Sequence, residues 1–281
     1  MTNLFHRNFF AMNTRFEVVS YGKDSEIFTR IFDKIETVVK ELETVISCYN
    51  TTSEVYGINH EQPVDYFGIT AELLKIIELS EKYKQKTRAC FDYCLPGNFV
   101  YNTAAFQPKP IGAKVELDLT TKKFRFTETG LALDFGAIGK GLALEKAAGI
   151  LAQNKITNCF ISFGDSSILT RGKHPHGPHW PFSLTKIKDC QFQLNEAAVS
   201  TSGTLQPDGN LHILDPRSHQ RIKEPKLVSV KSSSPVDAEV LSTALLVAEK
   251  HEISAILSNF ANYEIFIIDD DNNPKIRKFY G

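Results

Sequence analysis

The spacing of hydrophobic residues along this chain predicts a mixture of strands and helices. Residues 14–22, TRFEVVSYG, alternate between apolar and polar side chains and include β-branched residues, which predicts a first strand. From about Asp24 to Ile46, apolar residues recur every three or four positions, which predicts a long amphipathic helix. Residues 70–87 predict a second helix with Thr70 as its N-cap, and residues 236–250 predict a later one.

The remaining segments predict short strands joined by polar loops. Residues 47–60 are expected to form a loop, and residues 115–130 a hairpin that turns at TTKK. Further strands are expected within 158–169, 211–216, 226–234 and 263–271. Because strands and helices do not alternate in a regular βαβ rhythm, we expect an α+β fold instead of a doubly wound parallel sheet. We expect one domain over residues 1–281, with no boundary between lobes visible in the pattern.

Composition narrows the class of protein. With 281 residues, 42% of them hydrophobic, the chain can bury a sizeable core. A net charge of −1 without a basic stripe argues against nucleic-acid binding. No apolar run approaches the roughly 18 residues of a transmembrane helix. Five scattered cysteines and the lack of a signal sequence favour a cytoplasmic location, or a periplasmic lipoprotein if an upstream segment was removed.

The segment DFGAIGKG suggests a phosphate-binding turn between a strand and a helix. Counting back from Lys140 places Asp134 where a Walker loop needs glycine, and Gly141 follows the lysine, so the Walker pattern fails. Gly136, Gly139 and Gly141 also have the wrong order for a Rossmann fingerprint. The exposed N–H groups of the following helix still favour an anion. A tight turn with a surface lysine is an equally acceptable interpretation.

Two other clusters suggest metal binding. His174, His176 and His179 lie within six residues and could bind zinc, although the prolines and glycine around them favour a solvated loop. Cys90 and Cys94 have no second pair at a suitable spacing, so we expect them to be packing residues.

Two late segments carry residues suited to catalysis. His212 is predicted on a short strand that ends at Asp215, where it could act as a general base or be a buried structural histidine. Glu239 and Thr243 are four residues apart and therefore share one helical face. Their oxygens could hold Mg²⁺, although such a pair is usually solvated surface.

Several short segments, taken in order, match the pattern of one known family. AMNTRFEV resembles a Met-Gly-Thr strand, SCYNTTSEVYGIN a Ser/Tyr…Ser-Glu…Leu-Asn loop, and CFDY an Ala-Phe-Asp element. DFGAIGKGLALE is similar to Asp-Leu-Gly-Gly-Ile-Ala-Lys-Gly-Tyr-Ala-x-Asp. VSTSG, HILDPRS and AEVLSTAL resemble Ala-Thr-Ser-Gly, His-Ile-x-Asp-Pro-Arg-Thr and Ala-Asp-x-Leu-Ala-Thr-Ala-Leu. Nearly the whole chain therefore resembles the ApbE family of flavin transferases.

This resemblance implies a mixed α/β fold of two intimately joined lobes with an FAD site between them. It implies an Mg²⁺-dependent enzyme that splits FAD, attaches FMN to a Thr or Ser of an acceptor protein, and releases AMP. It implies His212 as the general base, and Mg²⁺ held by the Gly139 carbonyl, the Glu239 carboxylate and the Thr243 hydroxyl. The FAD site that it implies is lined by Met12, Cys90, Phe91, Asp92, Gly136, Lys140 and Ile213.

The chain departs from the family pattern at several of these places. Glu239 stands where the family has a metal-binding aspartate, and the extra methylene would shift the carboxylate by more than an ångström. Asn13 and His219 replace glycines, and GDSS replaces a Gly-Gly-Asp turn. These departures keep two alternatives open: an FAD-binding protein without transfer activity, and a pyrophosphatase that splits FAD into FMN and AMP. A plain zinc-binding protein is a third.

Overall fold

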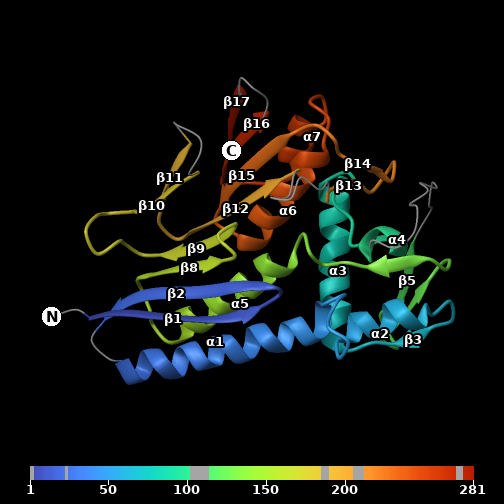
Figure 1. Ribbon diagram of the computed structural model, residues 1–281, viewed down its shortest axis with the longest axis horizontal. Helices are drawn as coiled ribbons and strands as arrows, with labels where there is room; N and C mark the ends of the chain where they lie inside the picture. Colours follow the sequence, from blue (N-terminus) through green and yellow to red (C-terminus); the bar gives the residue numbers. More distant parts are fainter. Residues whose placement is uncertain (1–2, 23–24, 102–113, 185–189, 205–211, 270–274) are drawn as a thin grey trace.

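The computed structural model describes residues 3–22, 25–101, 114–184, 190–204, 212–269 and 275–281. Its main feature is an eight-stranded sheet in the order β1-β2-β8-β9-β12-β15-β16-β17 (Figure 1). Every neighbouring pair in this sheet is antiparallel. The expected α+β class is therefore confirmed. The strands are β1 (Asn3–Ala11), β2 (Thr14–Gly22), β8 (Cys159–Phe163), β9 (Ser167–Arg171), β12 (Ala197–Gly203), β15 (Lys226–Ser232), β16 (Tyr263–Asp269) and β17 (Lys275–Tyr280).

Short strands and seven helices within the described residues complete the architecture. One small sheet has the order β3 (Phe67–Gly68), β6 (Lys123–Phe126) and β5 (Val115–Asp118). The other three are pairs: β4 (Cys94–Pro96) with β7 (Leu131–Leu133), β10 (Trp180–Ser183) with β11 (Gln191–Leu194), and β13 (Leu214–Asp215) with β14 (Gln220–Arg221). The helices are α1 (Ser25–Ile46), α2 (Glu54–Glu61), α3 (Ala71–Lys86), α4 (Gly97–Val100), α5 (Gly139–Gln153), α6 (Pro235–Val247) and α7 (Ile253–Leu257).

Alternation along the strands gives the main sheet two different faces. Ile265 and Ile267 of β16 pack into the large core, whereas the intervening Phe266 packs with Trp180 and Phe192 of the β10–β11 hairpin. The helices α5 and α6 contact the sheet on the side of the large core, and α1 packs against α5 and β1. One face is therefore covered by helices and the other by a hairpin.

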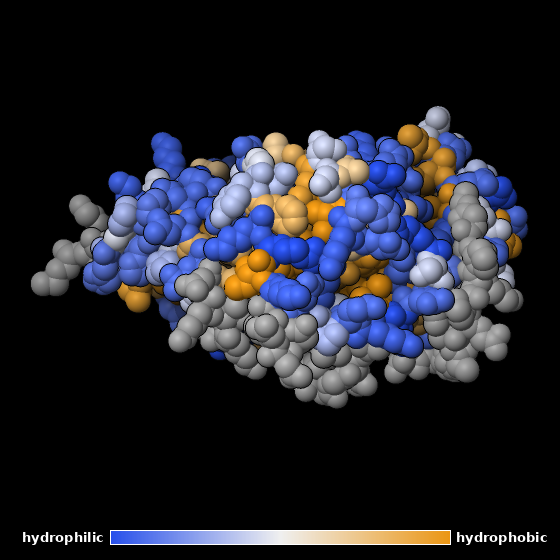
Figure 2. All heavy atoms as spheres, turned by 90° about the horizontal axis from the view of Figure 1, so that it is seen from above, coloured by the Kyte–Doolittle hydropathy of each residue, from blue (hydrophilic) through white to orange (hydrophobic). Residues whose placement is uncertain are grey.

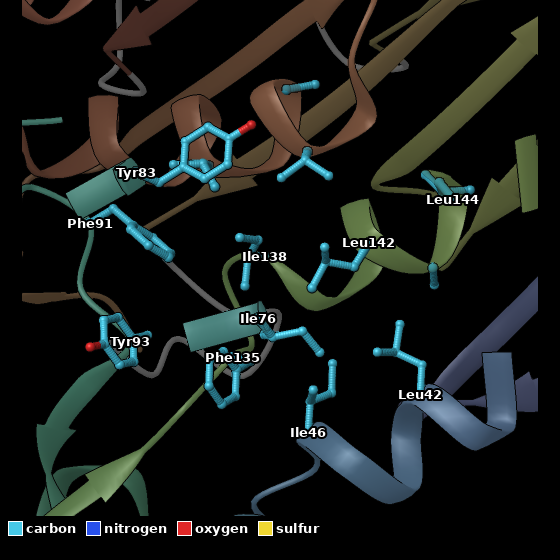
Figure 3. Packing of buried hydrophobic residues seen from close by; sticks show 14 of the residues in the cluster. Leu42, Ile46, Ile76, Tyr83, Phe91, Tyr93, Phe135, Ile138, Leu142 and Leu144 are labelled. Atoms are coloured by element: carbon cyan, nitrogen blue, oxygen red, sulfur yellow. The ribbon is translucent and has the colours of Figure 1, made fainter. Parts of the chain in front are cut away.

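The large core continues from the sheet into the helices that border the candidate site. Side chains from α1, α3 and α5 point into one interior space, including Leu42, Ile76 and Leu142 (Figure 3). Tyr83 spans this interior and donates a hydrogen bond of 2.6 Å from its hydroxyl to Asp237 at the start of α6. This continuous packing fixes the start of α5 relative to the start of α6.

Several sequence-based expectations about elements were wrong. The predicted loop over 47–60 contains α2, which Ser53 caps by accepting a hydrogen bond of 3.1 Å from the N–H of Tyr56. The strand β1 precedes the predicted first strand, and β17 follows the predicted last one. Both are edge strands with few buried side chains, so their apolar alternation is weak. The predicted strand at 158–169 is a hairpin of β8 and β9, which turns at Gly164 and Asp165.

The face of the molecule seen in Figure 2 is mostly polar. Hydrophilic side chains dominate the face in Figure 2, and hydrophobic ones are visible in patches near its centre. Among the helices that the structure describes, none combines the length and the hydropathy that crossing a membrane would require.

Candidate functional site

A cavity of about 1060 Å³ brings most of the predicted site residues together. This volume is slightly above the ~300–1,000 Å³ typical of small-molecule sites, which gives room for a ligand of dinucleotide size. Segments far apart in the sequence form its walls: the turn before β4, the β7–α5 turn, β12, the segment leading into β13, and α6. The predicted residues in its lining are Cys90, Phe91, Asp92, Gly136, Lys140, His212, Ile213, Glu239 and Thr243.

The turn between β7 and α5 is held from both sides. The buried side-chain amide of Asn59 in α2 accepts a hydrogen bond of 2.7 Å from the N–H of Leu133. It also donates one of 2.9 Å to the carbonyl of Leu133. At the next residue, the Asp134 carboxylate accepts a hydrogen bond of 2.8 Å from the N–H of Gly136. Burial raises the pKa of Asp134. The helix α5 then begins at Gly139.

Gly141 sets the distance between α5 and α6. A Cβ atom at this position would lie 2.8 Å from the carbonyl oxygen of Pro235 and 2.9 Å from the Cα of Val236. It would also lie 3.1 Å from the Cβ of Glu239. Only glycine therefore permits this approach, which places the first turn of α5 directly beside Glu239.

Glu239 is a buried carboxylate in the cavity wall, with 3% of its surface exposed. Its Oε1 accepts a charged hydrogen bond from the ammonium of Lys140. Its Oε2 accepts hydrogen bonds of 2.7 Å from Ser167 and 2.9 Å from Ser200. One turn later in α6, the Thr243 hydroxyl also lines the cavity. The helical spacing therefore places both predicted metal-binding side chains at one site.

Asp92 is the second buried carboxylate of the lining, but its partners differ. Its Oδ2 lies 2.9 Å from the Nζ of Lys114 and 3.2 Å from the Nζ of Lys84. Its Oδ1 accepts a hydrogen bond of 3.1 Å from the N–H of Cys94. Both oxygens are thus engaged by the protein. The neighbouring Cys90 is buried, which raises the pKa of its thiol to about 12, so it is a packing group at neutral pH.

His212 lines the cavity, and its predicted strand assignment was wrong. The strand β13 begins two residues later, at Leu214, and the side chain of His212 is exposed. This position excludes the interpretation of a buried structural histidine. The following residue, Ile213, is anchored because its carbonyl accepts a hydrogen bond of 2.9 Å from the N–H of Ile222. An accessible imidazole therefore faces the cavity from an anchored backbone.

Met12 and Gly139 lie next to the cavity and are not among the residues that line it. A Cβ at Gly139 would be 3.8 Å from the sulfur of Met12 and 3.0 Å from the Cδ1 of Ile46. Met12 and Asn13 form the two-residue turn between β1 and β2, with φ values of 49° and 59°. Asparagine tolerates this left-handed conformation, which explains how it can replace glycine there.

His219 is a second departure that the backbone explains. Its φ is 56°, in the left-handed region that glycine adopts most easily and that histidine tolerates better than most residues. Its N–H donates a hydrogen bond of 2.8 Å to the carbonyl of Asp215, which closes the turn between β13 and β14. The substitution therefore preserves the turn below His212.

Several lining residues were not predicted. Arg221 of β14 places its guanidinium 4.8 Å from the ring centre of Phe99, and both residues face the cavity. The cavity is also lined by Asp134 and by Tyr49, which is 59% exposed. Asp134 stands inside a motif that the sequence singled out, so it could have been found. Arg221 belongs to no such motif, and only the β13–β14 pairing brings it to the cavity.

The two other candidate metal clusters do not form metal sites in the part of the chain that the structure describes. No group of three or more His, Cys, Asp or Glu side chains there is arranged to hold a metal. The ring of His174 packs edge-on against Trp180 at 5.1 Å, and its Nδ1 accepts a hydrogen bond from the N–H of His176. Cys94, like Cys90, is buried. The expectation of packing cysteines agrees with this burial.

Comparison with known proteins identifies the family. The family model described as "ApbE family" matches residues 12–267, so the chain belongs to the ApbE family. A protein of Klebsiella pneumoniae named FAD:protein FMN transferase is 24% identical over 246 residues, which cover 80% of this chain and 76% of that protein. A protein of the same name from Salmonella typhimurium is 24% identical over 271 residues, covering 84% of this chain and 76% of that protein.

Solved structures share the fold over almost the whole chain. The flavin transferase ApbE from Vibrio cholerae superposes with a TM-score of 0.79 at 18% identity, covering 99% of this chain and 97% of that one. The flavinyl transferase ApbE from Pseudomonas stutzeri, in its apo form, gives a TM-score of 0.80 at 18% identity, covering 99% and 95%. At these identities the likeness establishes the fold.

Proposed function

We propose that this protein is an Mg²⁺-dependent FAD:protein FMN transferase. It would attach FMN through a phosphoester bond to a Thr or Ser of an acceptor protein and release AMP. The single observation that carries this proposal is the cavity in which an accessible His212 shares one space with Glu239, Thr243 and Lys140. Membership of the ApbE family and the names of the relatives agree with it.

The donor atoms suit Mg²⁺. Glu239 and Thr243 offer a carboxylate and a hydroxyl, and Gly139 would add a backbone carbonyl. Mg²⁺ prefers oxygen ligands, and it is usually bound through one or two carboxylates together with phosphates of the substrate. The ion pair of Lys140 with Oε1 of Glu239 places this oxygen against a positive charge, which supports the proposal. When bound, Mg²⁺ would neutralise negative charge on the phosphate oxygens.

The chain's own residues supply binding and proton transfer. The hydroxyl oxygen of the acceptor attacks the phosphorus of the FMN half of FAD, and the bond from that phosphorus to the AMP phosphate breaks. His212 takes the proton of the attacking hydroxyl, which is a weak nucleophile until a base is positioned beside it. The apolar side chains of Phe91 and Ile213 would pack against the bound FAD. Lys140 would contact its phosphates.

Replacement of His212 by alanine tests the proposed base. A positioned general base typically contributes about 10²–10⁴-fold to the rate, so FMN transfer to the acceptor should fall by this factor. Because the proposed role of His212 is to take a proton from the acceptor hydroxyl and not to hold FAD, FAD affinity should stay close to that of the wild type, measured by flavin fluorescence anisotropy. Transfer at the normal rate in this variant would remove His212 from the mechanism.

The two alternatives differ in their products. A pyrophosphatase would release AMP and free FMN while the acceptor remained unlabelled. A protein that only binds FAD would release neither. Chromatography of the nucleotides, run beside in-gel flavin fluorescence of the acceptor, separates all three activities.

A further inference from the structure

The two oxygens of the Glu239 carboxylate face different environments. Oε1 is bound by Lys140, which lines the cavity and keeps 24% of its side chain exposed. Oε2 is bound by Ser167 and Ser200, which are 0% and 2% exposed and lie behind the cavity lining. The carboxylate therefore has one oxygen on the cavity side and one on the buried side.

We propose that Ser167 and Ser200 are positioning residues, which fix Oε2 so that Glu239 offers Oε1 alone to a divalent cation in the cavity. This inference rests on the proposed function, because that function supplies the cation. It identifies a role for two serines that are not among the residues lining the cavity. It also predicts that Glu239 binds the cation through a single oxygen.

The placement of the two serines supports a positioning role. They are directly opposite each other on the neighbouring antiparallel strands β9 and β12, in the interior of the main sheet. Their backbones are therefore held by the sheet, and both hydroxyls converge on one oxygen atom. Hydrogen bonds to a charged group are shorter and about twice as strong as neutral ones. Two of them from a rigid support restrict the rotation of the glutamate carboxylate.

Holding the carboxylate in one position matters more for cation binding by glutamate than by the shorter aspartate. Glutamate has an additional rotatable bond, and its carboxylate can therefore occupy more positions. Mg²⁺ demands near-ideal octahedral geometry, so a ligand that samples several positions binds it weakly. Ser242 completes the support: its hydroxyl lies 3.1 Å from that of Ser200.

The test measures the Mg²⁺ concentration that half-saturates Mg²⁺-dependent FAD binding, followed by flavin fluorescence anisotropy without an acceptor protein. The variants are S167A, S200A and the double variant, with E239Q as the reference for loss of the carboxylate. S229A is the matched control. Ser229 is equally buried and bonds Thr201 at 2.8 Å, but it does not touch Glu239.

The double variant should raise the half-saturating Mg²⁺ concentration by about 10–100-fold, the usual cost of losing partners of a metal-binding side chain. The single variants should give smaller increases, S200T should restore most of the S200A loss, and S229A should equal the wild type. FAD affinity in EDTA should be the same in all variants. FAD affinity in EDTA distinguishes loss of carboxylate positioning from general damage to the FAD site. If the double variant does not fold, the comparison of S200T with S200A still tests the inference.

Two results would overturn the inference. One is an unchanged Mg²⁺ requirement in the double variant while E239Q raises it, which would leave the metal site and the proposed function intact. The other is a loss of FAD affinity in EDTA that matches the loss with Mg²⁺, which would make the serines structural. Failure of FMN transfer in the wild type, with the expected Mg²⁺ series preserved, would instead overturn the proposed function alone.

Discussion

Asp92 and Glu239 are two buried carboxylates in the same cavity, and the protein compensates their charges differently. Asp92 meets two lysines and a backbone N–H, so that Oδ1 and Oδ2 are both engaged from within the protein. Glu239 meets two neutral hydroxyls on one oxygen and a single lysine on the other. One carboxylate is enclosed by its own cations, and the other keeps an oxygen on the cavity side.

We propose that this difference separates a structural carboxylate, Asp92, from a functional one, Glu239. Lys114 is as buried as its partner Asp92, with 4% and 3% of the side chains exposed, so each requires the other. Lys140 is more exposed and could turn to an anionic ligand, but Glu239 is 4% exposed, so its charge would then need a bound cation in place of the lysine. The family resemblance assigns both carboxylates to the site, and under the proposed function we expect only Glu239 to meet the cation.

Among substitutions that test the contrast between Asp92 and Glu239, D92N should have the largest effect on stability. Removing one partner of a buried ion pair leaves an uncompensated charge and typically costs about 3–5 kcal/mol. The free energy of unfolding, measured by urea denaturation, should fall by this amount, while FAD affinity of the folded fraction changes little.

E116Q is the matched control for D92N. It removes a carboxylate from an exposed pair with Arg125, in which the side chains are 43% and 37% exposed. Such a pair contributes about 0–1 kcal/mol. A D92N protein that keeps its stability and loses FAD affinity would show that Asp92 acts on the ligand and that the proposed distinction is wrong.

A smaller effect is expected from G141A. The added Cβ would meet Pro235, Val236 and Glu239 at 2.8–3.1 Å, and overpacking of this kind costs about 1–3 kcal/mol. Because the strain falls on the backbone beside Glu239, the Mg²⁺ requirement for FAD binding should rise as well.

G149A provides the comparison within the same helix. A Cβ at Gly149 would have no atom within 4 Å, so this variant should gain about 0.5–1 kcal/mol from helix propensity and keep the wild-type Mg²⁺ requirement. Equal stability of G141A and G149A would contradict the close approach of α5 and α6.

Elements with strong periodicity could be predicted from the sequence, and elements without it could not. The helices α1, α3 and α6 each bury a broad apolar stripe or lie wholly inside, and Thr70 caps α3 as predicted. The helix α2 escaped prediction because it is short, contains Gly57 and buries only three side chains. The edge strands β1 and β17 escaped because an edge position requires little burial.

The site was predictable where a residue belongs to a motif, and unpredictable where only tertiary structure creates the contact. Spacing alone placed Glu239 and Thr243 on one helical face. Nothing in the sequence indicated that Ser167 and Ser200 would face each other, since they lie on β9 and β12, which β10 and β11 separate in the sequence. Lys114 likewise follows a segment of weak pattern, and only folding brings it to Asp92.

The proposed function requires that this protein transfer FMN to the hydroxyl of an acceptor protein. The most direct test is the intact mass of a purified acceptor that carries a Thr or Ser flavinylation site, after incubation with this protein, FAD and Mg²⁺. We predict that the acceptor gains the mass of FMN less one water, that AMP appears in equal amount, and that EDTA prevents both. AMP release with an unchanged acceptor mass, or an unchanged FAD pool, would contradict the proposed function.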